Sequence, residues 1–250
     1  MIKEIKEHKS VRNFSTKQVE KQKLEEILSA ATRASTVGNM QLYSIIVSQD
    51  KEILESLAPC HFSQPMLKDA PVIMTFCADV SRFSLWCKMR DAEPGYDNFL
   101  WFVNSVIDTT LASENAALEA QAQGLGICYL GTTLYTAEKI SEILNLPQGV
   151  IPVTTLAMGY PKEDIEHPMT DRLPLKGVVH YEKYSAYTNE GLEEIWRDRE
   201  TSEQTKQLLE ENKLDNLAKI FTDRRYTKKD SLHFSKVYFD FLTKQGFFNI

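Results

Sequence analysis

Alternate positions of a strip near the N-terminus carry side chains suited to binding an anion. The strip reads His8-Lys9-Ser10-Val11-Arg12-Asn13-Phe14. Alternate side chains of an extended segment share a face, so His8, Ser10 and Arg12 would converge on one ligand while Val11 and Phe14 anchor the strip to a core. Arginine offers a planar fork for phosphate oxygens or a ring carbonyl, and serine offers a small donor. The alternative interpretation is a solvated basic edge without a specific ligand.

Two further segments have residue types that suit the same ligand. Tyr129-Leu130-Gly131-Thr132 ends a predicted strand at a glycine, which lets backbone N–H groups approach a planar molecule closely. The same residues would also suit an ordinary strand-to-loop turn that binds no ligand. Arg172 lies close to Pro174, where a single arginine is usually a surface charge. It gains a role only if it meets His8 and Ser10 in space.

The sequence lacks the motifs by which a protein performs catalysis with its own side chains. There is no GxSxG, no phosphate-binding GxxxxGK[ST] and no evident Cys–His pair. Gly124-Leu125-Gly126 is not a dinucleotide fingerprint, because these glycines close a predicted helix and precede a strand. Dispersed phosphate and ring donors without an acid–base pair favour a cofactor that carries the chemistry itself.

Composition excludes several classes of protein. A net charge of −6 argues against general nucleic-acid binding, and no apolar run approaches the length of a membrane span. The N-terminus, Met-Ile-Lys-Glu-Ile-Lys-Glu, has no apolar leader, so we expect a cytoplasmic protein without membrane association. The four cysteines form no CxxC pair and the five histidines are scattered. These patterns predict reduced, buried thiols and no metal site.

Helices and strands mix along the first part of the chain. Apolar periodicity predicts helices over 18–33, 51–57, 102–122 and 136–144, the last one capped by Thr136. Apolar, β-branched runs predict strands over 43–48, 71–78, 127–130 and 150–159. Residues 82–100 look irregular and aromatic. The order lacks a strict βαβ repeat, so the fold class is α+β.

The residue composition of the chain changes near residue 189. Residues 190–213 are strongly charged and helix-forming, and a helix with apolar side chains from Phe234 to Leu242 closes the chain before Gly246. We therefore expect a core over 1–188 and a C-terminal helical arm over 189–250, packed on the core or on a second subunit.

The motifs together resemble the nitroreductase family, in its branch of NADPH-dependent flavin reductases and oxygen-insensitive nitroreductases. The likeness runs nearly end to end and rests on 8–14, Ser35-Thr36 to Gln41, 76–79, 124–131, 159–161, 172–174 and 240–247. It implies a three-layer α+β fold, with a mixed, mainly antiparallel sheet flanked by helices. It also implies a homodimer with one FMN per subunit at the interface.

The resemblance implies roles for individual residues. His8 and Ser10 would face the FMN phosphate with Arg172, and Arg12 would face the N1/O2 edge of the flavin. The cofactor-binding set that it implies is His8, Lys9, Ser10, Arg12, Ser35, Thr36, Gln41, Asp69, Tyr129, Leu130, Gly131 and Arg172. No side chain is implied to be catalytic, because flavin N5 carries the hydride chemistry.

Three positions depart from the family's pattern. Thr132 replaces a second glycine, Thr170 replaces a lysine near the phosphate arginine, and Asp69 stands where an amide is expected near the flavin pyrimidine. One cation fewer should weaken phosphate binding, and an anionic Asp69 should disfavour a reduced, anionic flavin. These departures bear on FMN affinity and redox potential.

The function implied is hydride transfer from NAD(P)H through FMN to nitroaromatics, quinones or flavins by a ping-pong route. Alternatives are a specialised flavin chemistry such as reductive dehalogenation, and a redox-sensing module with little turnover. Arg224, Arg225 and Lys228 would hold the 2′-phosphate of NADPH, with NADH as a second reductant, unless they form only a solvated loop. An obligate dimer is expected because the loop 35–41 has no evident partner in its own subunit and because the long Ala-rich helix from Phe102 would pack closely against a neighbour.

Overall fold

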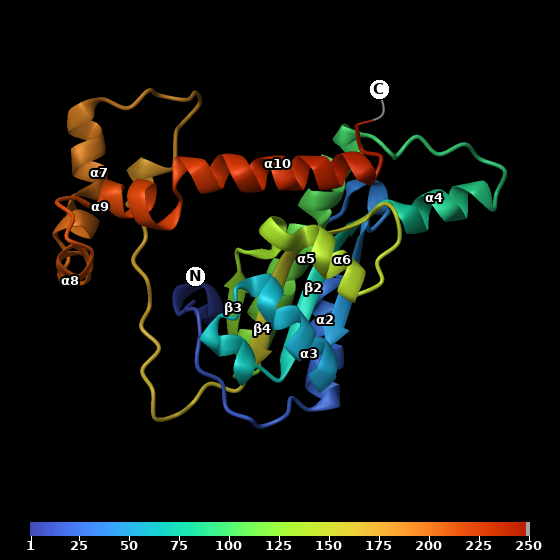
Figure 1. The fold of residues 1–250 in the computed structure, drawn as a ribbon, viewed down its shortest axis with the longest axis horizontal. Helices are drawn as coiled ribbons and strands as arrows, with labels where there is room; N and C mark the ends of the chain where they lie inside the picture. The colour runs from blue at the N-terminus through green and yellow to red at the C-terminus, as the bar shows by residue number, and fades with distance from the viewer. Residues whose placement is uncertain (249–250) are drawn as a thin grey trace. The chain divides into compact units, whose positions relative to one another are not determined.

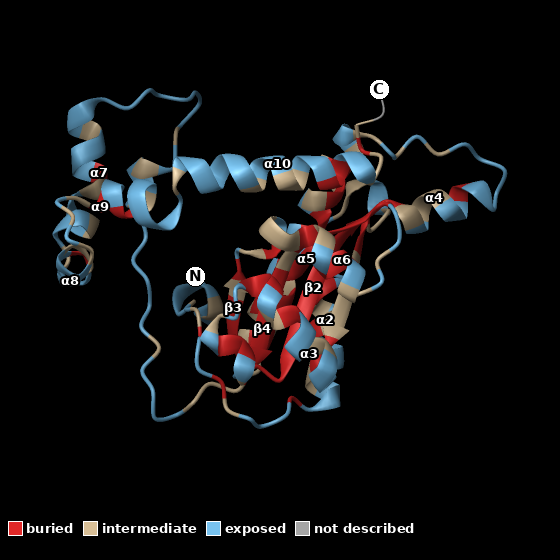
Figure 2. Cartoon of the chain, viewed as in Figure 1, coloured by how far each residue is buried: buried red, intermediate tan, exposed pale blue. Residues whose placement is uncertain are grey.

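The computed structural model describes residues 1–248, and an antiparallel sheet forms the core of its larger unit (Figure 1). Its four strands have the order β1-β2-β4-β3. Their bounds are Tyr43–Ser48 for β1, Val72–Asp79 for β2, Gly126–Leu130 for β3 and Val150–Gly159 for β4. Every residue of β2 is buried, as its continuous apolar run predicts (Figure 2). The predicted strands are confirmed to within one residue at each end.

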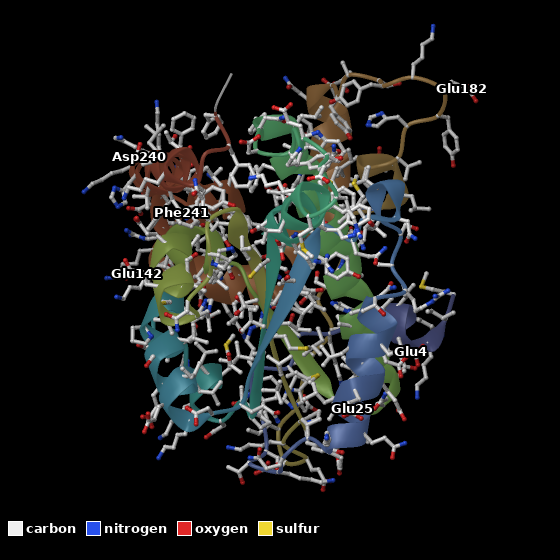
Figure 3. All side chains as sticks on the ribbon, turned by 90° about the vertical axis from the view of Figure 1, so that its right-hand side faces the viewer. Glu4, Glu25, Glu142, Glu182, Asp240 and Phe241 are labelled. Atoms are coloured by element: carbon white, nitrogen blue, oxygen red, sulfur yellow. The ribbon has the colours of Figure 1, made fainter. Side chains whose placement is uncertain are left out.

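Helices cover both faces of the sheet. On one face, α2 (Lys21–Ala31) and α5 (Phe99–Ala122) share a core with Met74 and Phe76 of β2. On the other, α3 (Lys51–Leu57) and α6 (Ala137–Ile143) share a core with Ile73. Figure 3 shows Glu25 of α2 and Glu142 of α6 on opposite sides of the sheet. The three-layer α+β fold is thus confirmed.

Short elements connect these layers. They are α1 (Lys3–Lys6), η1 (Val37–Asn39), η2 (Ala58–His61), η3 (Pro65–Lys68), α4 (Ser81–Lys88) and η4 (Thr133–Thr136). The C-terminal part contains η5 (Leu175–Gly177), α7 (Asn189–Thr201), α8 (Glu203–Asn212), α9 (Leu217–Lys219), the π-helix η6 (Ile220–Arg225) and α10 (Lys228–Lys244). No helix of the described residues is long and apolar enough to cross a membrane.

The chain divides into two compact units. One contains residues 1–169 together with the segment from Phe234 onward, and the other contains residues 170–233. Within the first unit, Phe241 and Leu242 of α10 are buried against the end of the sheet, so the closing helix contributes to the core. The domain division that we place at residue 188 stays a prediction.

Two local predictions are wrong. Residues 81–88 form the helix α4 within the segment expected to be irregular, and α5 begins at Phe99, where the Asn98 side chain accepts a hydrogen bond from the Trp101 N–H at 3.3 Å. Thr136 does not cap α6, because its hydroxyl donates instead to the Cys60 carbonyl at 2.7 Å. The Asn98 and Thr136 side chains form these hydrogen bonds locally or with a distant segment, and apolar periodicity does not report either kind of contact.

Candidate functional site

The N-terminal strip lies along the outer edge of β3. Ser10 forms a parallel bridge with Ile127, and the Val11 N–H donates to the Ile127 carbonyl at 2.8 Å. Val11 and Phe14 are buried, so their expected role as anchors is confirmed. Since the pairing is parallel, residues further along both segments advance together, and Arg12 runs beside Tyr129. This bridge adds the parallel component to an otherwise antiparallel sheet.

Gly126 makes the close approach of strip and strand possible. A Cβ at this position would lie 2.6 Å from the Cβ of Val11 and 2.7 Å from both of its methyl groups. Val11 is β-branched and buried, so its atoms near Gly126 cannot swing away. The glycine is therefore required for packing, which is a different reason from the helix-ending role of a turn glycine.

Gly126→Ala is expected to lower the free energy of unfolding by about 1–3 kcal/mol, because overpacking must displace the strip. Chemical denaturation measures this change. Gly95→Ala is the matched control, because a Cβ there would meet nothing within 4 Å. Equal stability of the two variants would show that the strip does not depend on this contact.

Two donors on the strip have no partner within the described chain. Neither the Ser10 hydroxyl nor the exposed Arg12 guanidinium makes a hydrogen bond or ion pair among residues 1–248. Burial raises the pKa of the Cys128 thiol on β3, and the charge of Arg12 opposes that rise. His8 differs, because its Nδ1 lies 2.9 Å from Oε1 of Gln121. Ser10 and Arg12 are thus the donors that remain for a ligand.

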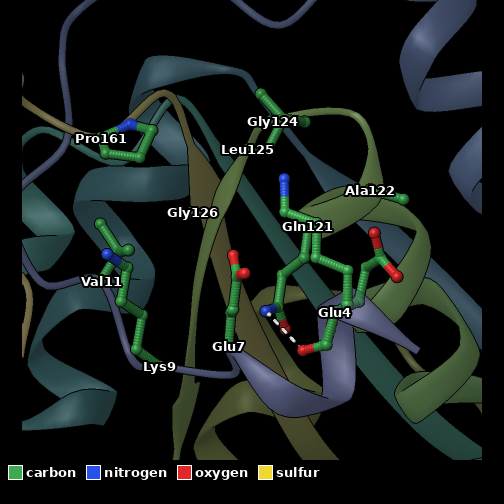
Figure 4. Close-up of a pocket in the computed structure, with 11 residues that line it drawn as sticks. Glu4, Glu7, Lys9, Val11, Gln121, Ala122, Gly124, Leu125, Gly126 and Pro161 are labelled. Atoms are coloured by element: carbon green, nitrogen blue, oxygen red, sulfur yellow. Dashed lines mark hydrogen bonds between the residues drawn. The ribbon is translucent and has the colours of Figure 1, made fainter. Parts of the chain in front are cut away.

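Lys9 faces a different environment from that of its neighbours. It lines an open cavity of about 280 Å³ with Glu4, Glu7 and Gln121, between α1 and the end of α5 (Figure 4). An anion placed in this cavity would meet two carboxylates. The predicted contact of Lys9 with a cofactor stays a prediction, and this cavity does not favour it.

The turn after β3 offers its backbone to a ligand. Leu130 is buried in the core beneath α3 and α6, and the Tyr129 hydroxyl lies 3.1 Å from Oγ of Ser113 on α5. Both side chains are therefore committed to packing. Gly131 is exposed, and a Cβ there would meet nothing within 4 Å. The open space at Gly131 lies along the same edge as Ser10 and Arg12.

The loop 35–41 is held by a buried carboxylate that sequence reasoning missed. Oδ2 of Asp108 accepts from the Thr36 hydroxyl at 2.7 Å and from the Leu42 N–H at 3.2 Å, and Oδ1 accepts from the Val37 N–H at 2.9 Å. Asp108 lies on α5 and is 2% exposed. The expectation that this loop lacks a partner in its own subunit is wrong. An acid among the apolar positions of a predicted helix was the available signal.

The remaining loop residues differ in what they leave free. The Gln41 amide donates to the backbone carbonyl and side-chain oxygen of Asn39 at 2.5 and 2.6 Å, and Arg82 donates to the Gln41 carbonyl. Asn39 and Gln41 both have positive φ, at 56° and 48°. Ser35 is exposed. The loop therefore has a fixed conformation that presents Ser35, while the side chains of Thr36 and Gln41 are used internally.

The other predicted site residues contact groups within the chain. Asp69 is half-exposed and forms a salt bridge of 3.5 Å with Lys162, which gives its carboxylate a cation. Arg172 belongs to the second unit, where it is exposed and donates to the Thr170 carbonyl at 2.7 Å. In the same unit, Arg224 donates to the Asn212 carbonyl at 3.4 Å and Arg225 lies over the Phe221 ring. Their cofactor contacts stay predictions.

A four-stranded sheet with helices on both faces and an N-terminal strip paired to its edge is the three-layer α+β architecture that the family resemblance implies. The sequence profile described as "Nitroreductase family" matches residues 5–160. That span covers the strip, the loop, the turn at Gly131 and all four strands. The chain belongs to the nitroreductase family.

Named relatives share most of the chain. An NADPH-dependent oxidoreductase of Staphylococcus aureus (strain USA300) is 34% identical over 184 residues, which is 73% of either chain. An FMN reductase (NADPH) of Bacillus subtilis is 30% identical over 191 residues, which is 76% of either chain. A crystal structure of a Bacteroides fragilis protein assigned as an oxidoreductase is 42% identical, with a TM-score of 0.95 over 99% of this chain and 100% of that one.

Proposed function

We propose that this protein takes hydride from NADPH and passes it, through bound FMN, to a nitroaromatic, a quinone or a free flavin by a ping-pong route. Membership of the nitroreductase family, with relatives named NADPH-dependent oxidoreductase and FMN reductase (NADPH), makes it an NAD(P)H-dependent flavin oxidoreductase. The acceptors and the kinetic mechanism are the proposal. The observation that carries the site is the unpaired pair Ser10 and Arg12 on the edge that leads to Gly131.

The residues present fit FMN. Bound FMN supplies hydride acceptance and donation at N5. Ser10 would bind the phosphate, together with the ring nitrogen of His8 that does not contact Gln121, and the Arg12 guanidinium would stabilise negative charge at the N1/O2 edge. The Gly131 backbone would contact the ring without obstruction by a side chain. The strip is fixed by its pairing with Ile127, so these donors need little rearrangement when they bind.

The absorbance of the purified protein tests this function. Bands of oxidised flavin should be present and should bleach when NADPH is added without oxygen. Repeated turnover with a nitroaromatic or quinone should follow, with parallel lines in double-reciprocal plots. Bleaching without turnover would instead indicate a redox-sensing module, and release of halide from a halogenated aromatic would indicate dehalogenation. A colourless protein that does not bind added FMN would refute the proposal.

We also propose a homodimer with FMN at the interface. Helix α5 exposes Leu100, Ile107 and Leu111, which are 64%, 51% and 43% accessible at helical spacing along one face. A second copy of the chain would bury this apolar face and would meet the exposed Ser35. Of the two sequence arguments for a dimer, the one from the loop 35–41 fails because Asp108 is the partner of that loop, whereas the one from the long helix α5 remains.

Ile107→Glu is expected to convert the dimer to a monomer and to reduce its FMN content, because a charge at the interface centre must be desolvated. Light scattering coupled to size exclusion measures the mass, and absorbance measures the flavin. Glu114→Gln, an exposed change on the same helix, is the control. A wild-type protein that is monomeric and flavin-loaded at micromolar concentration would contradict the proposal.

The basic residues of the second unit are proposed to hold the 2′-phosphate of NADPH. Replacing Arg224 and Arg225 by alanine should raise the KM for NADPH by about tenfold and leave the KM for NADH nearly unchanged, since NADH lacks that phosphate. Salt should weaken the NADPH preference of the wild type. Lys213→Ala, in the same unit, is the control. Equal losses for both reductants would count against this role.

The cellular compartment can be inferred from the proposed reductant and from the cysteines. We propose that the protein acts in the cytoplasm, where NADPH is available and thiols remain reduced. All four cysteines are free and buried in the structure, as the sequence predicts. They therefore act as small apolar side chains of the core.

A further inference from the structure

A buried histidine lies beneath the turn that follows β3. His61 ends η2 and its side chain is 0% exposed. Its Nδ1 lies 2.9 Å from Oγ1 of Thr132, and its Nε2 is buried without a hydrogen-bond partner in the described chain. Burial lowers the pKa of the imidazole to about 4, so the ring is neutral at pH 7. Burying a polar imidazole lowers the stability of the fold, and the hydrogen bond to Thr132 offsets only part of that free energy.

A second hydrogen bond joins the same two segments. The Thr136 hydroxyl donates to the carbonyl of Cys60 at 2.7 Å. Adjacent residues of η2, Cys60 and His61, are thus bonded to the two ends of the segment from Thr132 to Thr136. We call these two bonds the η2–η4 contact. They fix the turn in two places, so it cannot rotate about either bond alone.

The residues next to this contact are exposed. Gly131 precedes Thr132 and faces open space. Phe62 follows His61, is 54% exposed and holds φ at +55°, a left-handed conformation that is unfavourable for a residue other than glycine. Its ring centroid lies 6.2 Å from that of Tyr135. The η2–η4 contact therefore presents a backbone turn and an aromatic ring outward from a rigid base.

We propose that His61 and Thr132 are positioning residues for the flavin: their hydrogen bond fixes the turn at Gly131 in the conformation that contacts the FMN ring. This inference rests on the proposed function. Thr132 is the position at which the chain departs from the glycine pair of the family it resembles, and a glycine has no hydroxyl with which to hold a turn. The Thr132 hydroxyl therefore adds a directed hydrogen bond that a glycine at this position could not form. A turn that is already ordered loses less entropy when FMN binds.

The isosteric pair Thr132→Val and Thr132→Ser tests the role of the hydroxyl. Thr132→Val should raise the FMN dissociation constant about three- to tenfold, measured by the fluorescence of FMN released when the holoprotein is diluted. Thr132→Ser keeps the hydroxyl and should bind FMN as the wild type does. His61→Asn places an amide near the position of Nδ1 and should recover most of the affinity, whereas His61→Leu should not. Wild-type affinity in Thr132→Val would overturn the proposal.

A double variant separates positioning from stability. Thr132→Val leaves a second imidazole nitrogen without a partner, so its melting temperature should fall as well. His61→Leu combined with Thr132→Val removes both polar groups and should recover the melting temperature, while FMN binding stays weak. Recovery of both properties together would show that the bond only stabilises the fold, which overturns the proposal. Failure of the wild type itself to bind FMN would refute the proposed function, a result distinct from any difference among variants.

Discussion

Arg12→Ala should raise the FMN dissociation constant by about one to two orders of magnitude, because each charge-assisted hydrogen bond contributes about 1.5–3 kcal/mol. The Arg12 guanidinium makes no other hydrogen bond within residues 1–248, so its whole donor set is available to the ligand and its removal should leave the fold intact. We expect a loss of similar size for Arg172→Ala if that residue holds the phosphate. Fluorescence titration of FMN measures both.

The arginine series has an internal control. Arg12→Lys retains the charge without the planar fork, so its affinity should lie between those of the wild type and Arg12→Ala. Arg33→Ala, an exposed change at the end of α2, should have no effect. Purification of Arg12→Ala and Arg172→Ala with full flavin occupancy would show that the assignment of the site is wrong.

Replacement of Asp108 by asparagine should lower the free energy of unfolding by about 3 kcal/mol. The buried carboxylate accepts three hydrogen bonds. The side-chain NH₂ of an asparagine would instead face one or more of these N–H and O–H donors and leave them without an acceptor. The loop 36–42 should then open, so limited proteolysis should cut there first and FMN affinity should fall. Urea denaturation gives the stability change.

A surface substitution on the same helix is the control for the stability change of Asp108→Asn. Glu114→Gln removes an exposed charge from α5 and should change stability by less than about 0.5 kcal/mol. If Asp108→Asn and Glu114→Gln are equally stable, the three hydrogen bonds do not organise the loop. Loss of FMN affinity in Asp108→Asn without loss of stability would instead place the carboxylate at the cofactor.

Local patterns were sufficient for the regular elements. The strands 43–48 and 150–159 and the helix 51–57 have the predicted bounds, because β-branched runs and apolar spacing are properties of short segments. The helix α4 escaped prediction because its aromatic side chains have no clear helical stripe: Leu85 and Trp86 are exposed while Cys87 is buried. Such a helix depends on neighbours that periodicity does not report.

The candidate site was predictable in its residues but not in its contacts. The alternation from His8 to Arg12 predicts an anion-binding face without reference to the rest of the fold. The partner of Thr36, by contrast, lies on α5 at Asp108, and the partner of His61 is Thr132. Both are long-range pairs, and a single sequence does not state which distant polar residues meet. The family resemblance indicates FMN as the ligand, whereas the hydrogen bonds of Thr36 with Asp108 and of His61 with Thr132 are seen only in the structure.

The pairing of Val11 with Ile127 has a consequence for how the protein is made. The two residues are separated by almost half of the chain, and closing so long a loop carries an entropic cost before any contact forms. The strip at residues 8–14 is therefore translated well before β3 and has no strand edge to join until β3 follows. At the site that we propose, flavin uptake during synthesis would therefore have to wait for β3 and for β4, the strand with which β3 pairs.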